Sequence, residues 1–421
     1  MKRVLVIAYF FPPLGGVGIQ RTLRVLRHLR GIGWEAEVLT VGASGYPYRD
    51  ESALAGLPAD LAVHRVEAPD PERVQQSLGT SLPGKAARKV LTEWLYPLLY
   101  VPDRFEPWAR RAEAEAGRLL ATGRFDLVYA SVPPFSSTLT AVRAGRRSDV
   151  PVVLDFRDLW VASHYDPPHP LVRAVQERLE AEAVAGATRV ICVTEGLADS
   201  FRARYPGDAS RVTVIRNGFE SELLPEAEPP GAARELRLLH TGSLYGGRDL
   251  VPLIDGLAAF LDGRPDAEVR LRLVGSLPSR VTSAIEAASL DRAVERSGRV
   301  GHAESLRLLA ESDAAVAVQV PGLDLDAVPM KIYEAMGLHR PVLLLGEREA
   351  ESARILERAG LLYRADPGDP ASCERALEAL YADKQAGRLG ANIDEDYVAS
   401  FDMRNQIALF GEVFDRAAGG S

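Results

Sequence analysis

The sequence predicts an α/β fold made of two doubly wound, Rossmann-like domains that face a cleft. Two observations lead to this prediction. Short apolar runs alternate with amphipathic helical patterns in two successive blocks, and a segment rich in proline and charge separates the blocks. Such alternation is typical of parallel sheets covered by helices on both faces. Ligands of these sheets bind beyond the carboxyl ends of the strands, so the site is expected there.

Both blocks supply strands and helices in alternation. Strands of the first block are predicted at Arg3–Phe10, Glu35–Val41, Leu61–Val66, Leu127–Ser131, Val152–Phe156, Val190–Val193 and Val212–Arg216, and helices at Arg21–Leu29, Arg110–Ala121, Leu171–Ala185 and Leu197–Arg204. Strands of the second block are predicted at Leu236–His240, Val269–Val274, Ala314–Val320 and Pro341–Leu345, and helices at Leu250–Leu261, Glu304–Glu311, Met330–Met336 and Ser352–Ala359.

Composition places the domain boundaries. Residues 225–234 open with Pro-Glu-Ala-Glu-Pro-Pro-Gly, which suits a linker because it contains little that can pack. An N-terminal domain is therefore predicted at 1–224 and a C-terminal domain at 235–396. Residues 397–421 carry apolar side chains at mostly helical spacing, which predicts a final helix.

Composition also excludes several classes of protein. The chain has 421 residues, 47% of them apolar, and no run of 18 apolar residues, which argues against a membrane-spanning helix. The N-terminus enters a strand directly, which disfavours a cleavable signal peptide. Cys192 and Cys373 lie in apolar runs without metal-type spacing, as expected of reduced thiols in the cytoplasm. The pI of about 5.6 argues against nucleic acid as a partner.

Charge is distributed unevenly along the chain. Residues 1–225 contain 28 basic and 26 acidic side chains, whereas the remainder contains 22 and 32. Residues 1–30 contain six basic side chains and no acidic one. Because such a bias concerns partners rather than fold, we expect the N-terminal half to prefer an anionic acceptor or an anionic membrane.

The stretch Val328–Gly346 carries the most specific chemistry. Lys331 and Glu334 are three residues apart on a predicted helix, so they share a face. Lys331 falls in the first turn, where exposed N–H groups and the helix dipole favour an anion. A cation for phosphate and a carboxylate for sugar hydroxyls would suit a nucleotide-diphosphate sugar. The alternative is an ordinary surface salt bridge between the two residues.

A glycine-rich loop follows the first strand of the first block. Gly15, Gly16 and Gly18 lead into a helix, where backbone amides can approach a phosphate. The dinucleotide-binding fingerprint would need a further glycine at position 21, which is arginine, so a nicotinamide or flavin cofactor is not expected. A tight turn without a ligand is the alternative.

The second block repeats this arrangement. Gly242, Gly246 and Gly247 follow its first strand and precede Arg248 and a helix. A guanidinium can bind phosphate bidentately. The first glycine loop, Arg248 and Lys331 are therefore expected to converge on one diphosphate.

Taken together, the motifs resemble the GT-B retaining glycosyltransferases of family four. The matching features are the Gly-Gly-x-Gly loop, Thr241-Gly-Ser-Leu followed by a cation, Val214-Ile-Arg-Asn217-Gly218, Leu273-Val-Gly275, and Lys331-x-x-Glu334-Ala-Met-Gly. The resemblance covers nearly the whole chain. Asp155-Phe-Arg157-Asp158-x-Trp160 is similar to a subgroup common in bacterial surface-polysaccharide clusters.

The resemblance implies roles for the matching residues. Lys331 and Arg248 would act in catalysis by neutralising the departing diphosphate, and Glu334 would accept hydrogen bonds from the ribose. Retaining transfer of this kind proceeds on one face of the donor sugar and asks for charge stabilisation rather than a protein nucleophile. The implied donor-binding set is Gly15, Gly16, Gly18, Gly242, Arg248, His302, Asp326, Lys331 and Glu334, with His302 near the base.

Three positions depart from the family's pattern. Asp326 stands where the first of two glutamates is usual, Ser243 replaces an arginine, and Ser131-Val-Pro-Pro-Phe135 lacks a usual histidine. An Arg157–Asp158 ion pair that caps a strand end is the structural alternative to a role in acceptor binding. The acceptor side is assigned to Asp155, Arg157 and Asp158, of which Asp158 is the catalytic candidate.

No metal or cofactor is expected. Asp324-Leu-Asp326 mimics the Asp-x-Asp that holds a divalent metal in another glycosyltransferase fold. Here it precedes the Lys331 helix in a doubly wound domain, which is a different architecture. Transfer is therefore expected to be metal-independent.

The resemblance also bears on partners and location. It implies an acceptor-side domain at 1–224, a nucleotide-sugar domain at 235–396 and a final helix that crosses back to the first domain. Residues 85–103 join basic side chains to Trp94 and leucines, which can lie in a membrane interface or be buried. We therefore expect a cytoplasmic enzyme with a glycan, a lipid-linked oligosaccharide or a glycoconjugate intermediate as acceptor. Peripheral attachment to the inner face of the membrane is the expectation where residues 85–103 contact the bilayer. The alternatives are a nucleotide-sugar epimerase of the same shape and a non-catalytic nucleotide-sugar-binding partner.

Overall fold

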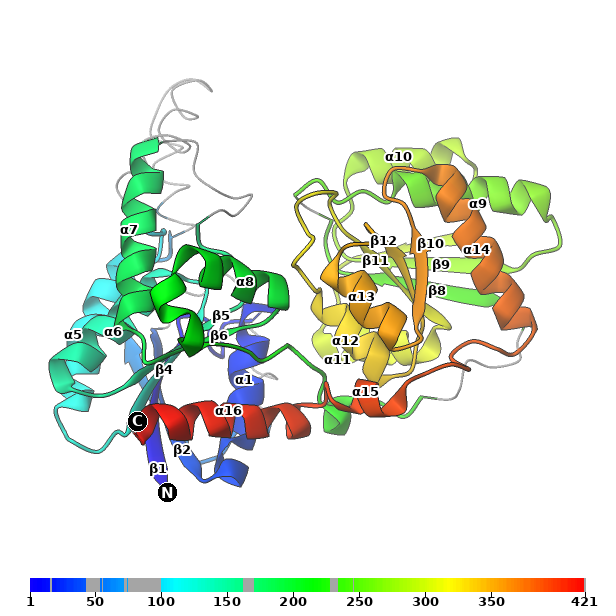
Figure 1. The fold of residues 1–421 in the computed structure, drawn as a ribbon. Coiled ribbons are helices and arrows are strands. Elements are labelled where there is room, and N and C mark those ends of the chain that lie inside the picture. Colours follow the sequence, from blue (N-terminus) through cyan, green and yellow to red (C-terminus); the bar gives the residue numbers. More distant parts are fainter. Residues whose placement is uncertain are drawn as a thin grey trace. The chain divides into compact units, whose positions relative to one another are not determined.

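The computed structural model describes residues 1–15, 17–42, 54, 56–71, 74, 100–161, 170–227, 234–244 and 246–419. The chain divides into two compact units. Unit 1 contains residues 1–216 and 406–421, and unit 2 contains residues 217–405. Each unit is a parallel sheet with helices on both faces (Figure 1). The predicted pair of doubly wound α/β domains is therefore confirmed.

Unit 1 has seven described strands in the order β3-β2-β1-β4-β5-β6-β7. They are β1 (Lys2–Ile7), β2 (Trp34–Val41), β3 (Ala62–Val66), β4 (Leu127–Val132), β5 (Val152–Phe156), β6 (Arg189–Cys192) and β7 (Val212–Val214). Its helices are α1 (Gln20–His28), α5 (Glu106–Leu120), α6 (Ser136–Ser148), α7 (Pro170–Gly186), α8 (Glu195–Arg204) and α16 (Met403–Ala418), which returns to pack beside β1 and β2 (Figure 1).

Unit 2 has six described strands in the order β10-β9-β8-β11-β12-β13. They are β8 (Leu236–Thr241), β9 (Val269–Val274), β10 (Val294–Ser297), β11 (Ala314–Val318), β12 (Val342–Leu345) and β13 (Leu362–Ala365). Its helices are α9 (Val251–Gly263), α10 (Ser279–Ala287), α11 (His302–Glu311), α12 (Met330–Gly337), α13 (Glu351–Arg358), α14 (Pro370–Gln385) and α15 (Glu395–Ala399).

Strand order fixes where a ligand can bind in each unit. In unit 1 the chain moves outward from β1 to β3 and then returns to β4 beside β1. In unit 2 it moves outward from β8 to β10 and returns to β11 beside β8. A crevice forms at the carboxyl ends of the strands where the order reverses. The two glycine-rich loops lie at these reversal points because each follows the first strand of its unit.

Several elements escaped the pattern analysis for a physical reason. β10 (Val-Glu-Arg-Ser) and β13 (Leu-Tyr-Arg-Ala) are short edge strands, so half of their side chains are polar or exposed. The helix α6 is buried although it reads Ser-Ser-Thr-Leu-Thr-Ala, because small hydroxyl side chains rather than large apolar ones fill its close contact with α5. α10 and α14 were also missed.

The first domain ends earlier than predicted. The segment after Arg216 packs on unit 2: the amide of Phe219 donates to the carbonyl of Phe401 at 3.1 Å, and the amide of Met403 donates to the carbonyl of Phe219 at 2.9 Å. Gly218 is needed there because a Cβ would lie 1.9 Å from the carbonyl oxygen of Phe401. The boundary predicted at 224/225 is therefore wrong by eight residues, since 217–224 belong to unit 2.

The basic N-terminal segment is largely neutralised inside unit 1. Arg21 is only 4% exposed, and exposed pairs satisfy other members of the set. This removes the main basis for expecting residues 1–30 to bind an anionic partner. The ion pairs are Lys2–Asp415, Arg3–Glu35, Arg21–Asp155 and Arg30–Asp60.

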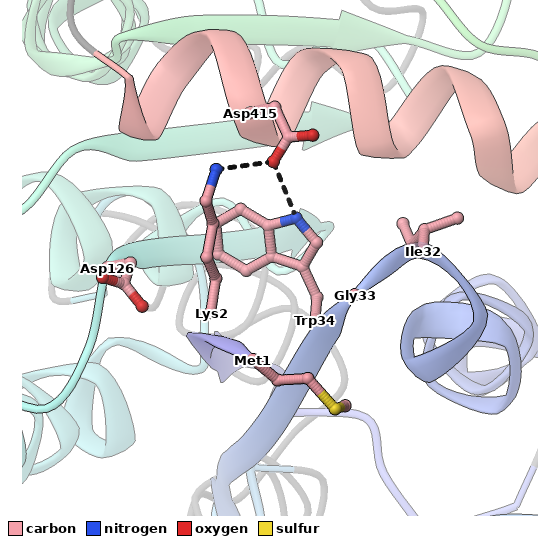
Figure 2. A pocket seen from close by; sticks show the side chains of 7 residues that line it. All are labelled: Met1, Lys2, Ile32, Gly33, Trp34, Asp126 and Asp415. Carbon is pink, nitrogen blue, oxygen red and sulfur yellow. Dashed lines mark hydrogen bonds and ion pairs between the residues drawn. The ribbon is translucent and has the colours of Figure 1, made fainter.

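A hollow of about 610 Å³ lies at the amino ends of β1 and β2. Figure 2 shows Lys2 and the indole of Trp34 both directed at Asp415 of α16 beside this hollow, at 2.9 and 3.2 Å. The hollow is at the end of the sheet opposite the glycine loop. Its polar groups therefore serve to attach α16 rather than to form the expected ligand site.

An internal ion pair holds the amino edge of the unit 2 sheet. Lys384 of α14 lies 2.7 Å from Asp313, and their side chains are 1% and 0% exposed. Asp313 also accepts the backbone N–H of Arg237 at 2.8 Å. Removing one partner of such a pair leaves a buried charge without compensation.

We expect Asp313→Asn to lower the free energy of unfolding of unit 2 by about 3–5 kcal/mol. Urea unfolding followed by circular dichroism measures both units, whereas tryptophan fluorescence reports unit 1, because all four tryptophans lie within it. The circular-dichroism midpoint should fall, with the fluorescence transition little changed. Glu304→Gln, in an exposed pair with Arg307, should have little effect on either. Unchanged circular-dichroism curves for Asp313→Asn would refute the role of the pair.

Candidate functional site

The loop after β8 is shaped by glycine. Gly242, Gly246 and Gly247 have φ angles of 107°, 62° and 90°, which glycine adopts without strain. Gly275, at the end of β9, approaches so closely that a Cβ would lie 2.5 Å from the carbonyl oxygen of Gly242. The loop therefore turns tightly at the carboxyl edge of the sheet and delivers Arg248 to the reversal point between β8 and β11.

Arg248 is paired with a buried carboxylate from the loop after β11. Its Nη2 lies 3.0 and 2.9 Å from the two carboxylate oxygens of Asp324, which is 3% exposed. Asp324 also accepts the backbone N–H of Val320 at 2.9 Å. Asp324 thus has a structural use. No cluster of metal-ligating side chains is found among the residues that the structure describes.

Lys331 has no acidic partner among the residues that the structure describes. It stands in the first turn of α12, its Nζ 3.6 Å from the position that a Cβ on Gly242 would take. Within the described part of the chain it makes no hydrogen bond or ion pair. Burial, and to a smaller extent the nearby charge of Arg248, lowers the pKa of Lys331 to about 8, whereas the charge of Glu334 raises it slightly. A cation beside a second cation is a group that an anion would stabilise.

Glu334 does not form the surface salt bridge that was the alternative for this helix. It is buried, and its Oε1 lies 2.8 Å from Nε2 of His302, at the start of α11. The side chains are 11% and 34% exposed. The structure therefore brings together the residues predicted for the ribose and for the base, which are 32 positions apart in the sequence.

Asp326 lies between Asp324 and Lys331 in the sequence. It is half-buried and has no hydrogen bond or ion pair with any residue in the described ranges. Its loop is held by Gln319, whose Nε2 donates to the carbonyls of Asp324 and Ala327 at 3.0 and 2.8 Å. The carboxylate of Asp326 is thus presented on a fixed backbone.

His240 is a site residue that sequence reasoning missed. It is 1% exposed on β8, and its Nδ1 lies 3.1 Å from the carbonyl oxygen of Val316. Burial lowers the pKa of His240 well below the usual value, with a further lowering from Lys331. The ring is therefore neutral, so it adds no third positive charge. Its place one residue before Thr241-Gly242 was the available signal.

The first glycine loop lies at the reversal point of unit 1. Gly16 is outside the described residues. The carbonyl of Gly18 accepts a hydrogen bond from Nη1 of Arg157 at 2.6 Å, which ties the loop to the end of β5. Arg157 also donates to the carbonyls of Val132 and Pro133 at 3.1 and 2.7 Å. Arg157 therefore joins the loops after β1, β4 and β5.

The prediction that Asp155 handles an acceptor is wrong. Its side chain is fully buried and accepts two hydrogen bonds from Arg21, at 2.7 and 2.8 Å, and one from the hydroxyl of Tyr129 at 2.5 Å. Arg157 is likewise occupied by backbone carbonyls. Asp158 is exposed at the carboxyl end of β5 and is the member of this cluster that a substrate can reach.

The membrane-contact segment falls mostly outside the described ranges. Only residues 100–103 of 85–103 are described. Among the described helices, none combines the length and apolar character needed to cross a bilayer.

Two family models match consecutive parts of the chain. The glycosyl transferase 4-like domain matches residues 15–218, and the glycosyl transferases group 1 domain matches residues 235–383. The chain belongs to the GT-B glycosyltransferases. The matched ranges correspond to units 1 and 2, so each predicted half of this glycosyltransferase has its own family model.

Individual relatives are distant. The probable glycosyltransferase WbjE of Pseudomonas aeruginosa is 31% identical over 83 residues, which is 20% of this chain and 21% of that protein. The chain thus matches about a fifth of the length of this curated relative. HepE of Anabaena, solved with UDP and glucose, has a TM-score of 0.69 at 16% identity, covering 99% of this chain and 100% of HepE.

The same fold also occurs in a protein whose name describes an epimerase. A putative UDP-N-acetylglucosamine 2-epimerase of Listeria monocytogenes has a TM-score of 0.61 at 12% identity, covering 100% of this chain and 98% of that chain. A glycosyltransferase of Rickettsia africae reaches 0.69 at 11% identity, covering 100% and 99%. At these identities the likeness establishes the fold alone.

Lys331→Met is expected to stabilise the protein without ligand at pH 7. Because the folded-state pKa of about 8 lies below the unfolded value of about 10.4, folding with a protonated Lys331 is unfavourable below pH 8. The parent chain should be less stable than Lys331→Met by about 1–2 kcal/mol at pH 7, a value discounted for partial exposure.

The difference should shrink as pH rises from about 8 to about 10.4, since the parent then loses the unfavourable proton. Urea unfolding by circular dichroism at several pH values measures it. Lys384→Met is the matched control: it removes the buried cation beside Asp313 and leaves only the more exposed Arg237 at 3.2 Å, so it should destabilise. A Lys331→Met variant less stable than the parent at pH 7 would contradict this account.

Proposed function

We propose that this glycosyltransferase is a retaining enzyme that moves a sugar from a nucleotide-diphosphate sugar to a hydroxyl acceptor. The observation that carries the proposal is the pair of neighbouring cations at the reversal point of unit 2. Lys331 has no acidic partner among the described residues, and burial together with the neighbouring charge of Arg248 lowers its pKa. A diphosphate would supply compensating charge. HepE, of the same fold, was solved with UDP and glucose.

Different residues of unit 2 contact different parts of the donor in this proposal. Lys331 and Arg248 stabilise the charge that develops on the diphosphate as the sugar departs. Glu334, held by His302, accepts hydrogen bonds from the ribose hydroxyls. Asp326, on its fixed loop, contacts a sugar hydroxyl in place of the usual glutamate. The backbone at Gly242 lies beside Lys331 and completes the phosphate contacts of this unit.

The acceptor side rests on fewer residues. Asp158 is the exposed carboxylate that receives the acceptor hydroxyl, and Gly15 and Gly18 belong to the loop that Arg157 fixes beside it. The leaving diphosphate assists deprotonation, so no protein nucleophile and no metal are included in the proposal. The acceptor is a glycan, a lipid-linked oligosaccharide or a glycoconjugate intermediate. The enzyme works in the cytoplasm, peripherally on the inner face of the membrane when the acceptor is lipid-linked.

An epimerase that acts on the donor alone is the second candidate. The hydrogen-bonded His302 and Glu334 are an imidazole and a carboxylate within reach of one ligand, which acid–base chemistry on a sugar would use. A putative epimerase shares the fold. The two functions differ in one requirement, because an epimerase turns over without an acceptor.

The full chain should therefore be incubated with UDP- and GDP-sugars, with and without lipid-extract acceptors. Acceptor-dependent loss of donor with a glycosylated product is the expected result. Isomerised donor without acceptor identifies an epimerase, and binding without turnover identifies a non-catalytic partner.

Lys331→Met tests the phosphate contact. It should weaken the binding of UDP or GDP by about 1.5–3 kcal/mol, while the affinity for uridine or guanosine stays within a factor of two. Equal losses for nucleotide and nucleoside would remove Lys331 from the phosphates.

Glu334→Gln tests the ribose contact. The amide keeps the shape of the side chain but replaces a charged acceptor, so we expect about 1–2 kcal/mol weaker binding of UDP or GDP. The matching 2′,3′-dideoxy nucleotide lacks both hydroxyls and should bind the variant and the parent alike. Calorimetric titration of both ligands gives the ratio. Glu304→Gln, on the neighbouring helix α11, is the control, and an unchanged ratio for Glu334→Gln excludes the ribose role.

A further inference from the structure

Asp324 carries an unexplained charge for a site that binds a diphosphate. It belongs to the Asp-x-Asp motif that predicts no metal here. The side chain is 3% exposed, and both carboxylate oxygens lie within 3.0 Å of Nη2 of Arg248. A carboxylate beside a bound diphosphate repels it. Its presence next to a phosphate-binding arginine therefore requires a compensating advantage.

The surroundings of Asp324 are rigid. The backbone N–H of Val320 donates to its Oδ2 at 2.9 Å, and Nε2 of Gln319 donates to its carbonyl oxygen at 3.0 Å. The glycine loop packs against the same segment, since a Cβ on Gly247 would lie 3.6 Å from a methyl group of Val320. Asp324 is thus fixed at both its backbone and its carboxylate before it meets Arg248.

Arginine gains most from such a support. A guanidinium presents five N–H donors in a rigid fork, but the side chain that carries it has about 2 kcal/mol of rotamer entropy. A carboxylate that holds Nη2 restricts the rotamers that the arginine side chain can adopt. Arg248 is 17% exposed, so it retains access to a ligand, and its charge acts on Lys331.

We propose that Asp324 is a positioning residue for the diphosphate: through Nη2 it holds the Arg248 guanidinium beside Lys331 in the geometry that binds the phosphates. The inference rests on the proposed nucleotide-diphosphate donor. Asp324 itself does not touch the ligand. Its contribution is to have Arg248 ordered in advance, so that binding does not have to order it.

The sign of one substitution separates positioning from simple charge. Asp324→Asn removes a negative charge near the phosphates, so electrostatics alone predicts tighter binding of UDP or GDP. Positioning predicts the opposite, because an amide holds the guanidinium less firmly than a carboxylate does. We expect binding about fivefold to thirtyfold weaker, with the affinity for uridine or guanosine unchanged.

Asp324→Asn made in the Arg248→Ala background is the second part of the experiment. With no guanidinium left to position, removal of the carboxylate should leave the affinity unchanged or raise it. Asp249→Asn is the matched control: it removes a neighbouring negative charge that pairs with Arg280 at 3.1 Å rather than with the Arg248 side chain. It should leave UDP or GDP binding unchanged or slightly tighter.

Each outcome decides between the two claims. If Arg248→Ala weakens the binding of UDP or GDP and Asp324→Asn does not, the positioning role is wrong while the donor proposal stands. Equal losses from Asp324→Asn in both backgrounds likewise overturn positioning. If neither UDP nor GDP binds the parent chain, or Arg248→Ala changes nothing, the phosphate site fails and Asp324 loses its role with it.

Folding is checked by the melting temperature of each variant without ligand. Should Asp324→Asn fail to fold, the affinity of Arg248→Lys for UDP or GDP is measured instead. Lysine keeps the charge but lacks the fork that a carboxylate can hold while phosphate binds. Weaker binding of UDP or GDP by Arg248→Lys supports positioning, and affinity equal to that of the parent overturns it.

Discussion

The candidate site of unit 2 depends on a positive charge, that of Lys331, which the described part of the fold leaves without an acidic partner. Lys331 stands in the first turn of α12, beside Arg248 and above a neutral histidine. The opposite side of the same helix is anchored in the core by Ile332, Tyr333 and Met336, each no more than 1% exposed. Packing therefore holds the ammonium in place although its own environment disfavours it, which is the usual relation between a binding site and stability.

Backbone geometry explains why these groups meet. β8 and β11 are neighbours in the sheet but lie far apart in the sequence, so the loops at their carboxyl ends are adjacent in space. Positive-φ glycines let the loop after β8 turn back within a few residues. Gln319 fixes the loop after β11 by donating hydrogen bonds to two of its carbonyls. The side chains of the site project from these loops and from the first turns of α11 and α12, whereas the strands supply rigidity.

Sequence patterns predicted what is local and missed what is distant. Lys331 and Glu334 share a helix, so their spacing revealed them. The partners of Arg248 and Glu334 could not be read in the same way, because Asp324 is 76 residues from Arg248 and His302 is 32 from Glu334. Asp155 was assigned to the acceptor because the family's usual histidine is missing after the preceding strand and Asp155 belongs to the charged motif that could replace it. The chain gave no sign that Arg21, 134 residues away, occupies it.

Arg21 and Arg248 show that an arginine near a glycine loop has two possible meanings. Arg21 is 4% exposed; it binds both oxygens of Asp155, donates to the carbonyls of Ile215 and Arg216, and lies 5.1 Å from the ring of Phe410. Those contacts join α1, β5, β7 and α16, so they are structural. Arg248 is more exposed and stands beside a second cation. Exposure and a neighbouring cation, rather than residue type or motif, thus distinguish Arg248 as the arginine proposed to bind phosphate in unit 2.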